Sequence, residues 1–215
     1  MKILSALLDL LYPPKCVFCR KLLQTQNVDM CADCRGNLPV VIGSLKRGEC
    51  YRTCYAAYYY EDDVAESIKR FKFRGQRQYA DAYGRILAML ILRNCIEFDV
   101  LTWVPISDCR AKERGYRQTE LLACATANEL GIGAVRTLTK IKDNPAQSSL
   151  PNSTARKRNV KDAYKAYAPE KFSGKHILLI DDVITSGATL SECSRTLLKA
   201  GAKSVVCVTL AAVRN

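Results

Sequence analysis

Two adjacent carboxylates and a run of small hydroxylated residues stand between an aliphatic segment and a helix near the C-terminus. Asp181 and Asp182 follow the aliphatic segment, and Thr-Ser-Gly-Ala-Thr occupies residues 185–189. A helix that begins at such a loop offers free backbone N–H groups and the positive end of its dipole, which together bind phosphate. Gly187 has no Cβ, so the chain can approach the phosphate closely. The carboxylates can accept hydrogen bonds from sugar hydroxyls or hold Mg²⁺ through water. The stretch therefore predicts a site for a phosphorylated sugar.

The elements around this stretch form a strand–loop–helix–strand unit. The run 177–180 is aliphatic throughout, which is typical of a strand buried on both faces of a parallel sheet. This strand is expected to end at the acidic pair, and a helix to about Lys199 follows, with Gly201 just beyond it. A second aliphatic strand is expected at 205–210. The alternative interpretation is a buried strand capped by a small-residue loop, with the acidic pair merely solvated.

The order of these residues resembles the phosphoribosyl pyrophosphate (PRPP) signature of type I phosphoribosyltransferases. The shared features are the hydrophobic strand, the Asp-Asp pair, two further residues and the Thr-Ser-Gly-Ala-Thr run. The resemblance implies that PRPP contacts the acidic pair and the loop after it. The residues concerned are Asp181, Asp182, Thr185, Ser186, Gly187, Ala188 and Thr189.

Charge and cysteine content limit the class of protein. The chain has 215 residues, a formal net charge of +12, a single histidine and 11 cysteines. This length can hold one α/β domain with a small appendage. The basic excess favours polyanionic partners: nucleic acid, anionic lipid or a phosphate-rich small molecule. Many cysteines without a signal peptide are typical of the reducing cytosol, so a cytoplasmic location is expected. The histidine, His176, is interpreted as structural rather than as a general base.

Two Cys-x-x-Cys pairs near the N-terminus predict a zinc site. Four thiolates at this spacing can complete a tetrahedral shell around one Zn²⁺, and such a closed shell is structural rather than catalytic. A segment this small has almost no core, so the metal would supply its folding free energy. A redox role for either pair is the alternative. Cys50 and Cys54 form a looser pair at a predicted strand and are not expected to bind metal. The predicted ligands are Cys16, Cys19, Cys31 and Cys34.

The N-terminal part of the chain is expected to form a unit of its own. Residues 1–11 carry leucines at the spacing of a short amphipathic helix, which packs on its own protein or, as the less favoured alternative, contacts a membrane surface. The helix is too short to span a bilayer, so no transmembrane segment is expected. Residues 38–48 read as a linker because they contain a proline and two glycines. We therefore expect a zinc-binding domain at 1–45 and a phosphoribosyltransferase-like domain at 46–215.

Basic residues gather after a predicted helix that Asp63 and Glu66 are expected to open as a capping box. A nucleic-acid patch and cations placed simply at a helix C-terminus are equally good interpretations of this group. Its members are Lys69, Arg70, Lys72, Arg74 and Arg77.

A second basic segment, residues 108–117, follows a buried strand at 100–104 and is expected to be a loop. Open α/β sheets bind ligands at this end of their strands, and arginine binds phosphate oxygens bidentately. We therefore favour a pyrophosphate-gripping loop over a solvated one. A further strand is expected at 134–141. The long polar loop 143–159 is interpreted as a basic lid over the leaving pyrophosphate.

Over nearly its whole length the chain resembles the ComF family, phosphoribosyltransferase-like proteins linked to DNA uptake in competent bacteria. One departure is Arg117, where the family usually has Asn, and no role is carried over to that position. The features that carry the resemblance are the amphipathic start with Pro-Pro, the two Cys-x-x-Cys pairs, 68–75, 104–107, 114–118, Gln147 with Arg156 and Asn159, the signature at 181–189 and the final strand.

The resemblance implies a type I phosphoribosyltransferase fold, which is an α/β fold with a five-stranded parallel sheet flanked by helices, together with a small N-terminal Cys₄ zinc domain. It also implies binding of PRPP with Mg²⁺. Asp181, Asp182 and Arg114 are the expected catalytic residues. Further PRPP contacts are expected from Ser107, Arg110 and Arg156.

Two functions follow from these expectations. The first is a phosphoribosyltransferase with an unidentified acceptor, acting in DNA uptake. The alternative is a non-catalytic competence factor that holds single-stranded DNA and cooperates with a DNA helicase. The net charge and the tyrosines at 55–60 favour this alternative, because bases stack on aromatic rings while cations follow the backbone. A zinc-stabilised regulator that senses PRPP ranks last, because no helix-turn-helix is recognisable.

Overall fold

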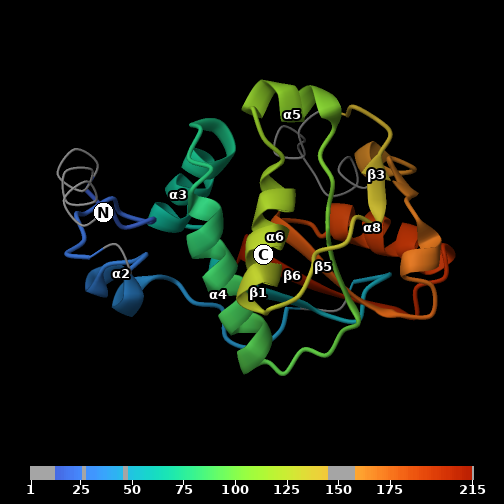
Figure 1. Cartoon of the computed structure of the whole chain (residues 1–215), viewed down its shortest axis with the longest axis horizontal. Helices are drawn as coiled ribbons and strands as arrows, with labels where there is room; N and C mark the ends of the chain where they lie inside the picture. Colours follow the sequence, from blue (N-terminus) through green and yellow to red (C-terminus); the bar gives the residue numbers. More distant parts are fainter. Residues whose placement is uncertain (1–12, 26–27, 46–47, 145–157, 215) are drawn as a thin grey trace.

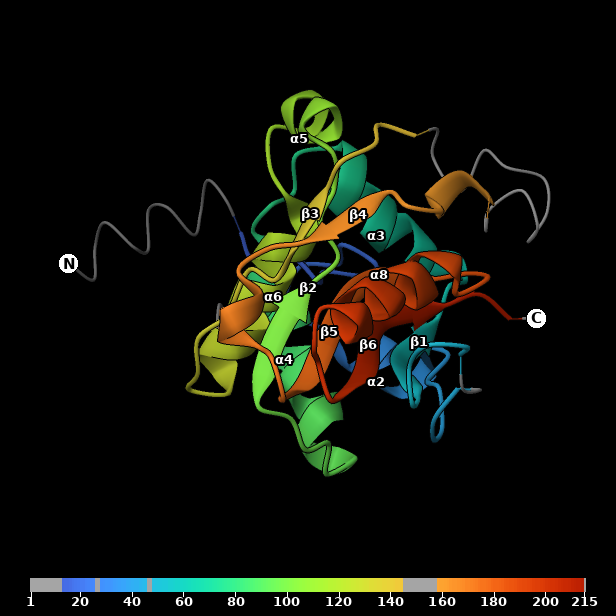
Figure 2. The ribbon, with the colours of Figure 1, turned by 90° about the vertical axis from the view of Figure 1, so that its right-hand side faces the viewer.

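A sheet of four parallel strands forms the centre of the protein (Figures 1 and 2). The computed structural model describes residues 13–25, 28–45, 48–144 and 158–214. The sequence-based predictions for 1–11, Gln147 and Arg156 lie outside these residues. In spatial order the strands are β1 (Cys54–Tyr59), β6 (Ser204–Ala212), β5 (His176–Ile184) and β2 (Val100–Trp103).

Helices cover both faces of this sheet. One face packs against α3 (Asp62–Phe73), α4 (Tyr79–Arg93) and α6 (Gln118–Glu129), and the other packs against α8 (Ala188–Lys199). Successive side chains of a strand point to opposite faces. Accordingly Leu178 and Ile180 of β5 are buried with the first set of helices, while Ile177 and Leu179 are buried on the α8 side. The apolar run therefore forms a doubly covered parallel strand, as its sequence predicts.

The edge of the sheet beyond β2 carries one further parallel bridge, between Leu101 and Ala134. The expected strand 134–141 does not continue along β2. Instead its end, β3 (Leu138–Lys140), pairs antiparallel with β4 (Tyr164–Ala166) in a separate two-stranded sheet. The chain leaves the edge because Leu138, at 1% exposure, joins the apolar cluster on the α8 side.

Three local predictions differ from the structure. β5 continues through Asp181 and Asp182 to Ile184, because β6 pairs with it along this whole length. The segment expected to be a loop at 108–117 contains α5 (Asp108–Arg114), whose N-terminus is capped by the hydroxyl of Ser107. The capping box is wrong: α3 begins at Asp62 without a side-chain cap. Two further short helices are α2 (Ala32–Asn37) and the 3₁₀ helix η2 (Pro169–Lys171).

The cysteine-bearing segment packs directly on α3 (Figure 1). Phe18, fully buried, makes an edge-to-face contact with Tyr58, with ring centroids 5.3 Å apart. The hydroxyl of Ser67 donates to the carbonyl oxygen of Val17 at 2.5 Å, and the guanidinium of Arg70 donates to the carbonyl oxygens of Val17 and Phe18. The first Cys-x-x-Cys turn is thus held by its backbone as well as by its side chains.

Replacing Arg70 should destabilise the fold. In Arg70→Met the carbonyl of Phe18 loses its donor, whereas the carbonyl of Val17 keeps Ser67. A buried unpaired carbonyl costs about 2 kcal/mol, which corresponds to a fall in Tm of about 4–8 °C for a protein of this size. Thermal unfolding measures this fall. The matched control is Lys69→Met on the exposed side of the same helix, and an equal fall in Tm for the control would contradict the assignment.

No helix in the described part of the chain has both the length and the apolar character needed to cross a membrane.

Candidate functional site

The four predicted zinc ligands lie together. Their Sγ atoms are all within 4.8 Å of one another, and those of Cys19 and Cys31 are 3.5 Å apart. Tetrahedral Zn–S bonds of about 2.3 Å place sulfurs about 4 Å apart, so the cluster fits one Zn²⁺ with a closed shell. Cys50 and Cys54 are not part of this cluster within the described ranges. The Cys₄ group is a structural zinc site.

The acidic pair reaches the end of β5 with its two side chains on opposite faces of the sheet. Asp182 turns toward α3, where the ammonium of Lys72 lies 2.7 Å from its carboxylate. Asp181 lies near Lys140 of β3 and Tyr164 of β4, and its carboxyl group accepts the backbone N–H of Asp182 at 2.9 Å. Both residues are buried, with 9% of the surface of Asp181 and 5% of that of Asp182 exposed. The two carboxylates therefore occupy different environments.

Burial raises the pKa of Asp181 to about 8, and the neighbouring charge of Asp182 adds to the rise, while Lys72 and Lys140 oppose it. Near pH 7 Asp181 is therefore mostly protonated. A protonated carboxyl group can donate a hydrogen bond as well as accept one, so Asp181 can pair with a hydroxyl of a ligand in either sense.

Stability should consequently fall as pH rises. The folded pKa of Asp181 lies above the ordinary value of 3.8, so between these values the folded state holds a proton that the unfolded chain lacks. This contribution is complete below about pH 4, is lost progressively as pH rises, and is gone above about pH 8. In Asp181→Asn the free energy of unfolding should fall less steeply with pH, by about 1 kcal/mol per pH unit between these two pKa values. Urea unfolding from pH 5 to 9 measures it, and parallel curves for the two proteins would refute the pKa assignment.

A cleft of about 330 Å³ opens over the acidic pair. Arg114 lies over the ring of Phe73 at 4.9 Å, and burial lowers the pKa of its guanidinium. The pKa of Lys140 is lowered as well, by burial and by the charge of Arg110. The charged residues that line the cleft are Lys72, Arg110, Glu113, Arg114, Lys140, Asp181 and Asp182.

The loop after β5 forms a small hollow between the cleft and the start of α8. Its residues Asp181 and 183–190 enclose this space, and α8 begins at Ala188. Gly187 caps the helix with φ +72°, in the left-handed region that favours glycine. A Cβ there would also lie 2.8 Å from the hydroxyl of Tyr51. The loop thus leads into a helix N-terminus, which a phosphate site requires, and Gly187 is needed both for its φ and for the space that the Tyr51 hydroxyl occupies.

Some of the other residues predicted to contact PRPP line the cleft and others do not. Arg110 and Arg114 line the cleft. The hydroxyl of Ser107 instead donates to Asp143 at 2.5 Å, outside the cleft lining. Arg117 is exposed and pairs with Asp108 at 2.5 Å, and Arg156 lies outside the described residues.

The chain matches two known domain families and several named proteins. Residues 7–52 match the double zinc ribbon domain and residues 117–215 match the phosphoribosyl transferase domain. DNA utilization protein YhgH of Salmonella typhimurium is 29% identical over 88% of this chain and 86% of its own length. Competence protein F of Haemophilus influenzae is 27% identical over the same shares. Competence protein ComFC of Bacillus subtilis is 30% identical over 72% of this chain and 62% of its own length.

The chain belongs to the ComF family. A solved structure of an allosteric regulatory enzyme of purine biosynthesis matches 66% of this chain and 29% of the enzyme's chain, with 21% identity and a TM-score of 0.45. The assignment does not rest on this likeness. The type I phosphoribosyltransferase fold is confirmed by the domain match and the parallel sheet. The domain boundary at residue 45 stays a prediction.

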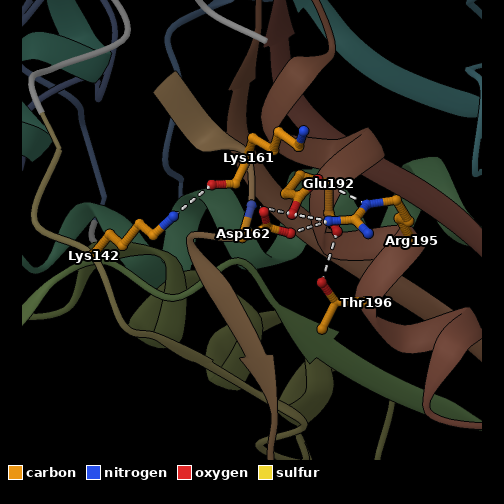
Figure 3. A network of polar contacts seen from close by, with 6 residues as sticks. All are labelled: Lys142, Lys161, Asp162, Glu192, Arg195 and Thr196. Carbon is orange, nitrogen blue, oxygen red and sulfur yellow. Dashed lines mark hydrogen bonds and ion pairs between the residues drawn. The ribbon is translucent and has the colours of Figure 1, made fainter. Parts of the chain in front are cut away.

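A polar network in this ComF-family protein ties the strands beside the cleft to α8 (Figure 3). Glu192, buried within α8, accepts the backbone N–H of Asp162 at 2.8 Å. Arg195 bridges the carboxylates of Glu192 and Asp162, at 2.5 and 3.0 Å. Lys142 donates to the carbonyl of Lys161 at 3.1 Å. Because α8 begins at the loop after β5, the network fixes that loop relative to β4.

Sequence reasoning missed two residues of the site. Lys72 belongs to the basic group for which a nucleic-acid patch and helix-terminal cations are equally good interpretations, and neither predicts that it faces Asp182. Tyr51 carries no sequence signal for the site, but it is buried against Gly187. Both residues are remote in the chain from what they contact, and only the fold brings them together.

Proposed function

We propose that this ComF-family chain binds PRPP with Mg²⁺, transfers its phosphoribosyl group to an acceptor, and acts in DNA uptake. The observation that supports the proposal is the convergence of the acidic pair, the phosphate loop and basic side chains at one end of β5. Ligands of open parallel sheets bind at the carboxyl ends of the strands, which is where this cleft lies. The family's competence and DNA utilization proteins support the role in DNA uptake.

PRPP would lie along the cleft with each of its parts against a different group. The 5′-phosphate accepts hydrogen bonds from the backbone N–H groups and hydroxyls of residues 185–189. The ribose hydroxyls meet Asp181 and Asp182, and the diphosphate faces Arg110 and Arg114. When bound, Mg²⁺ would be held by the acidic pair through water and by the diphosphate, where it neutralises the charge that develops on the leaving group.

In the proposed reaction the bond between C1 of ribose and the diphosphate oxygen breaks, and its electron pair leaves with pyrophosphate. A lone pair of the acceptor forms the new bond to C1, and the acceptor releases a proton. The sugar carries positive charge during the exchange, which the carboxylate of Asp182 can stabilise while the arginines hold the departing anion. The burial of the acidic pair strengthens these interactions, because a site of low dielectric screens charges weakly.

Calorimetric titration of PRPP with Mg²⁺ into zinc-loaded protein tests the proposal. We expect micromolar affinity for PRPP, and weaker binding of ribose 5-phosphate and of pyrophosphate, because each fills only part of the cleft. Absence of binding to protein that is folded by circular dichroism would overturn the proposal.

A second candidate function, a DNA-binding competence factor that cooperates with a helicase, is supported by the net charge of +12 and by the named relatives. The tyrosines invoked for base stacking contribute less than expected. Tyr58 is buried, and the guanidinium of Arg214 lies 3.9 Å from the ring centroid of Tyr59. DNA binding would therefore depend on exposed basic residues such as Arg74 and Arg77. Fluorescence anisotropy with labelled single-stranded DNA should show an affinity that falls steeply between about 50 and 200 mM salt. An affinity that does not change with salt concentration would reject this candidate.

A cytoplasmic location also belongs to the proposal, with a membrane contact through residues 1–11 as the alternative to packing of this segment on the protein itself. Partition of the full-length chain and of a chain without these residues between vesicles of anionic lipid and buffer would test the contact. Equal partition of the two chains would contradict it.

A further inference from the structure

Lys72 occupies a position in the cleft that the signature residues do not account for. It lies in the last turn of α3, and its ammonium is 2.7 Å from the carboxylate of Asp182. The Lys72 side chain is 19% exposed and that of Asp182 7% exposed. Of the other cations of this helix, Lys69, 48% exposed, pairs with Glu66 at 2.8 Å, and Arg70 is buried against the first Cys-x-x-Cys turn. Lys72 is therefore the cation of α3 that lines the cleft.

The cleft is lined by more basic than acidic side chains. Four basic side chains, including Lys72, line it with three acidic ones. This excess of cations over carboxylates attracts a ligand with several negative charges. An ammonium has three N–H donors, and Asp182 needs only one of them.

The position of Lys72 is set by the helix that carries it. Ser67 and Arg70, on the same helix, donate to backbone carbonyls of the first Cys-x-x-Cys turn. Phe71 is fully buried against the ring of Tyr83, with centroids 5.3 Å apart. The last turn of α3 is thus fixed on the zinc-binding segment and on α4, so that its one inward ammonium is held at the cleft before any ligand arrives. Pre-organised donors of this kind bind anions without a reorganisation cost.

We propose that Lys72 is a binding residue for the diphosphate of the ligand and that it serves as the counter-ion of Asp182 until the ligand enters. The inference rests on the proposed function. When the ribose hydroxyls donate to Asp182, the ammonium shifts its hydrogen bonds to the adjacent diphosphate oxygens. Lys72 then exchanges one anionic partner for another and remains paired throughout.

Titration of pyrophosphate with Mg²⁺, and separately of ribose 5-phosphate, into the zinc-loaded full chain tests the role. Lys72→Met should weaken pyrophosphate binding about tenfold or more, because a charge-assisted hydrogen bond is lost. Ribose 5-phosphate, which lacks the diphosphate, should bind within about threefold of wild type, a difference of under 1 kcal/mol. Lys72→Arg should retain pyrophosphate binding, and Lys69→Met is the matched control on the same helix. Lys72→Gln, which keeps a donor for Asp182, replaces the Met variant if that variant does not fold.

The Asp182→Asn background separates a direct contact from an indirect one. If Lys72 touches the diphosphate, Lys72→Met weakens pyrophosphate binding in this background too. An effect that disappears there would mean that Lys72 acts only through Asp182, which overturns the inference. If the wild type binds PRPP but Lys72→Met binds pyrophosphate as tightly as the wild type does, the inference about Lys72 is overturned and the proposed function stands. Absence of PRPP binding in the wild type overturns the proposed function and the inference with it.

Discussion

Replacing both carboxyl groups of the acidic pair, in Asp181→Asn/Asp182→Asn, is expected to weaken PRPP binding by about 100-fold or more. A hydrogen bond from a ribose hydroxyl to the carboxylate of Asp182 is worth about 1.5–3 kcal/mol, and one to the neutral carboxyl group of Asp181 about 0.5–1.5 kcal/mol, so the two losses together amount to about two factors of ten or more. Asparagine keeps the size of aspartate, so the buried site is not emptied. The measurement is calorimetric titration of PRPP with Mg²⁺ into each protein.

The chain offers a matched control for this variant. Asp62 and Asp63 are also adjacent, but they are exposed at the start of α3. Asp62→Asn/Asp63→Asn should bind PRPP as the wild type does. Equal affinity of the acidic-pair variant and this control, with both proteins folded, would mean that PRPP does not use the acidic pair.

Removal of zinc is expected to have the largest effect on stability. The Cys₄ segment is small, so the metal supplies the free energy that keeps it folded. Its unfolding exposes Val17 and Phe18, which are buried against the rest of the protein, and leaves Arg70 without its carbonyl partners. Loss of one buried aromatic side chain costs about 3–5 kcal/mol, so we expect Tm to fall by about 10 °C or more.

Thermal unfolding with and without a chelator measures this fall, with zinc release followed by a colorimetric indicator. Cys34→Ser should reproduce it, because Cys34 belongs to the cluster. Cys124→Ser is the control, since this thiol is exposed on α6. A chelator that strips the zinc and leaves Tm unchanged would contradict the structural role of the metal.

The parts of the fold that depend on local pattern could be predicted from the sequence. The aliphatic runs predicted β5 and β6, the periodicity after Gly187 predicted α8 to Lys199, and the cysteine spacing predicted the Cys₄ cluster. In each case the signal lies within a few residues, because burial on both faces of a strand or ligation of one ion constrains neighbouring side chains directly.

The contacts between remote segments could not be predicted. Lys72 meets Asp182 only because α3 and β5 are neighbours in space, and Arg70 is buried because the Cys-x-x-Cys turn offers it carbonyl oxygens. Neither interpretation of the basic group, a nucleic-acid patch or cations at a helix C-terminus, predicts that its members have three different environments. Arg70 is buried, Lys72 lines the cleft and Arg74 is exposed. The separation of the two carboxylates onto opposite faces follows from strand alternation, but it required knowing that β5 continues through them.

The most direct test of the central claim, that the loop at 185–189 holds the phosphate of PRPP, is amide hydrogen exchange with and without saturating PRPP and Mg²⁺. Peptides that cover residues 183–190 should exchange more slowly in the presence of the ligand, because the loop N–H groups become hydrogen-bonded to phosphate. The acidic-pair variant should lose this protection at the same ligand concentration. Unchanged exchange in these peptides of the wild type, at a PRPP concentration that saturates binding, would contradict the account.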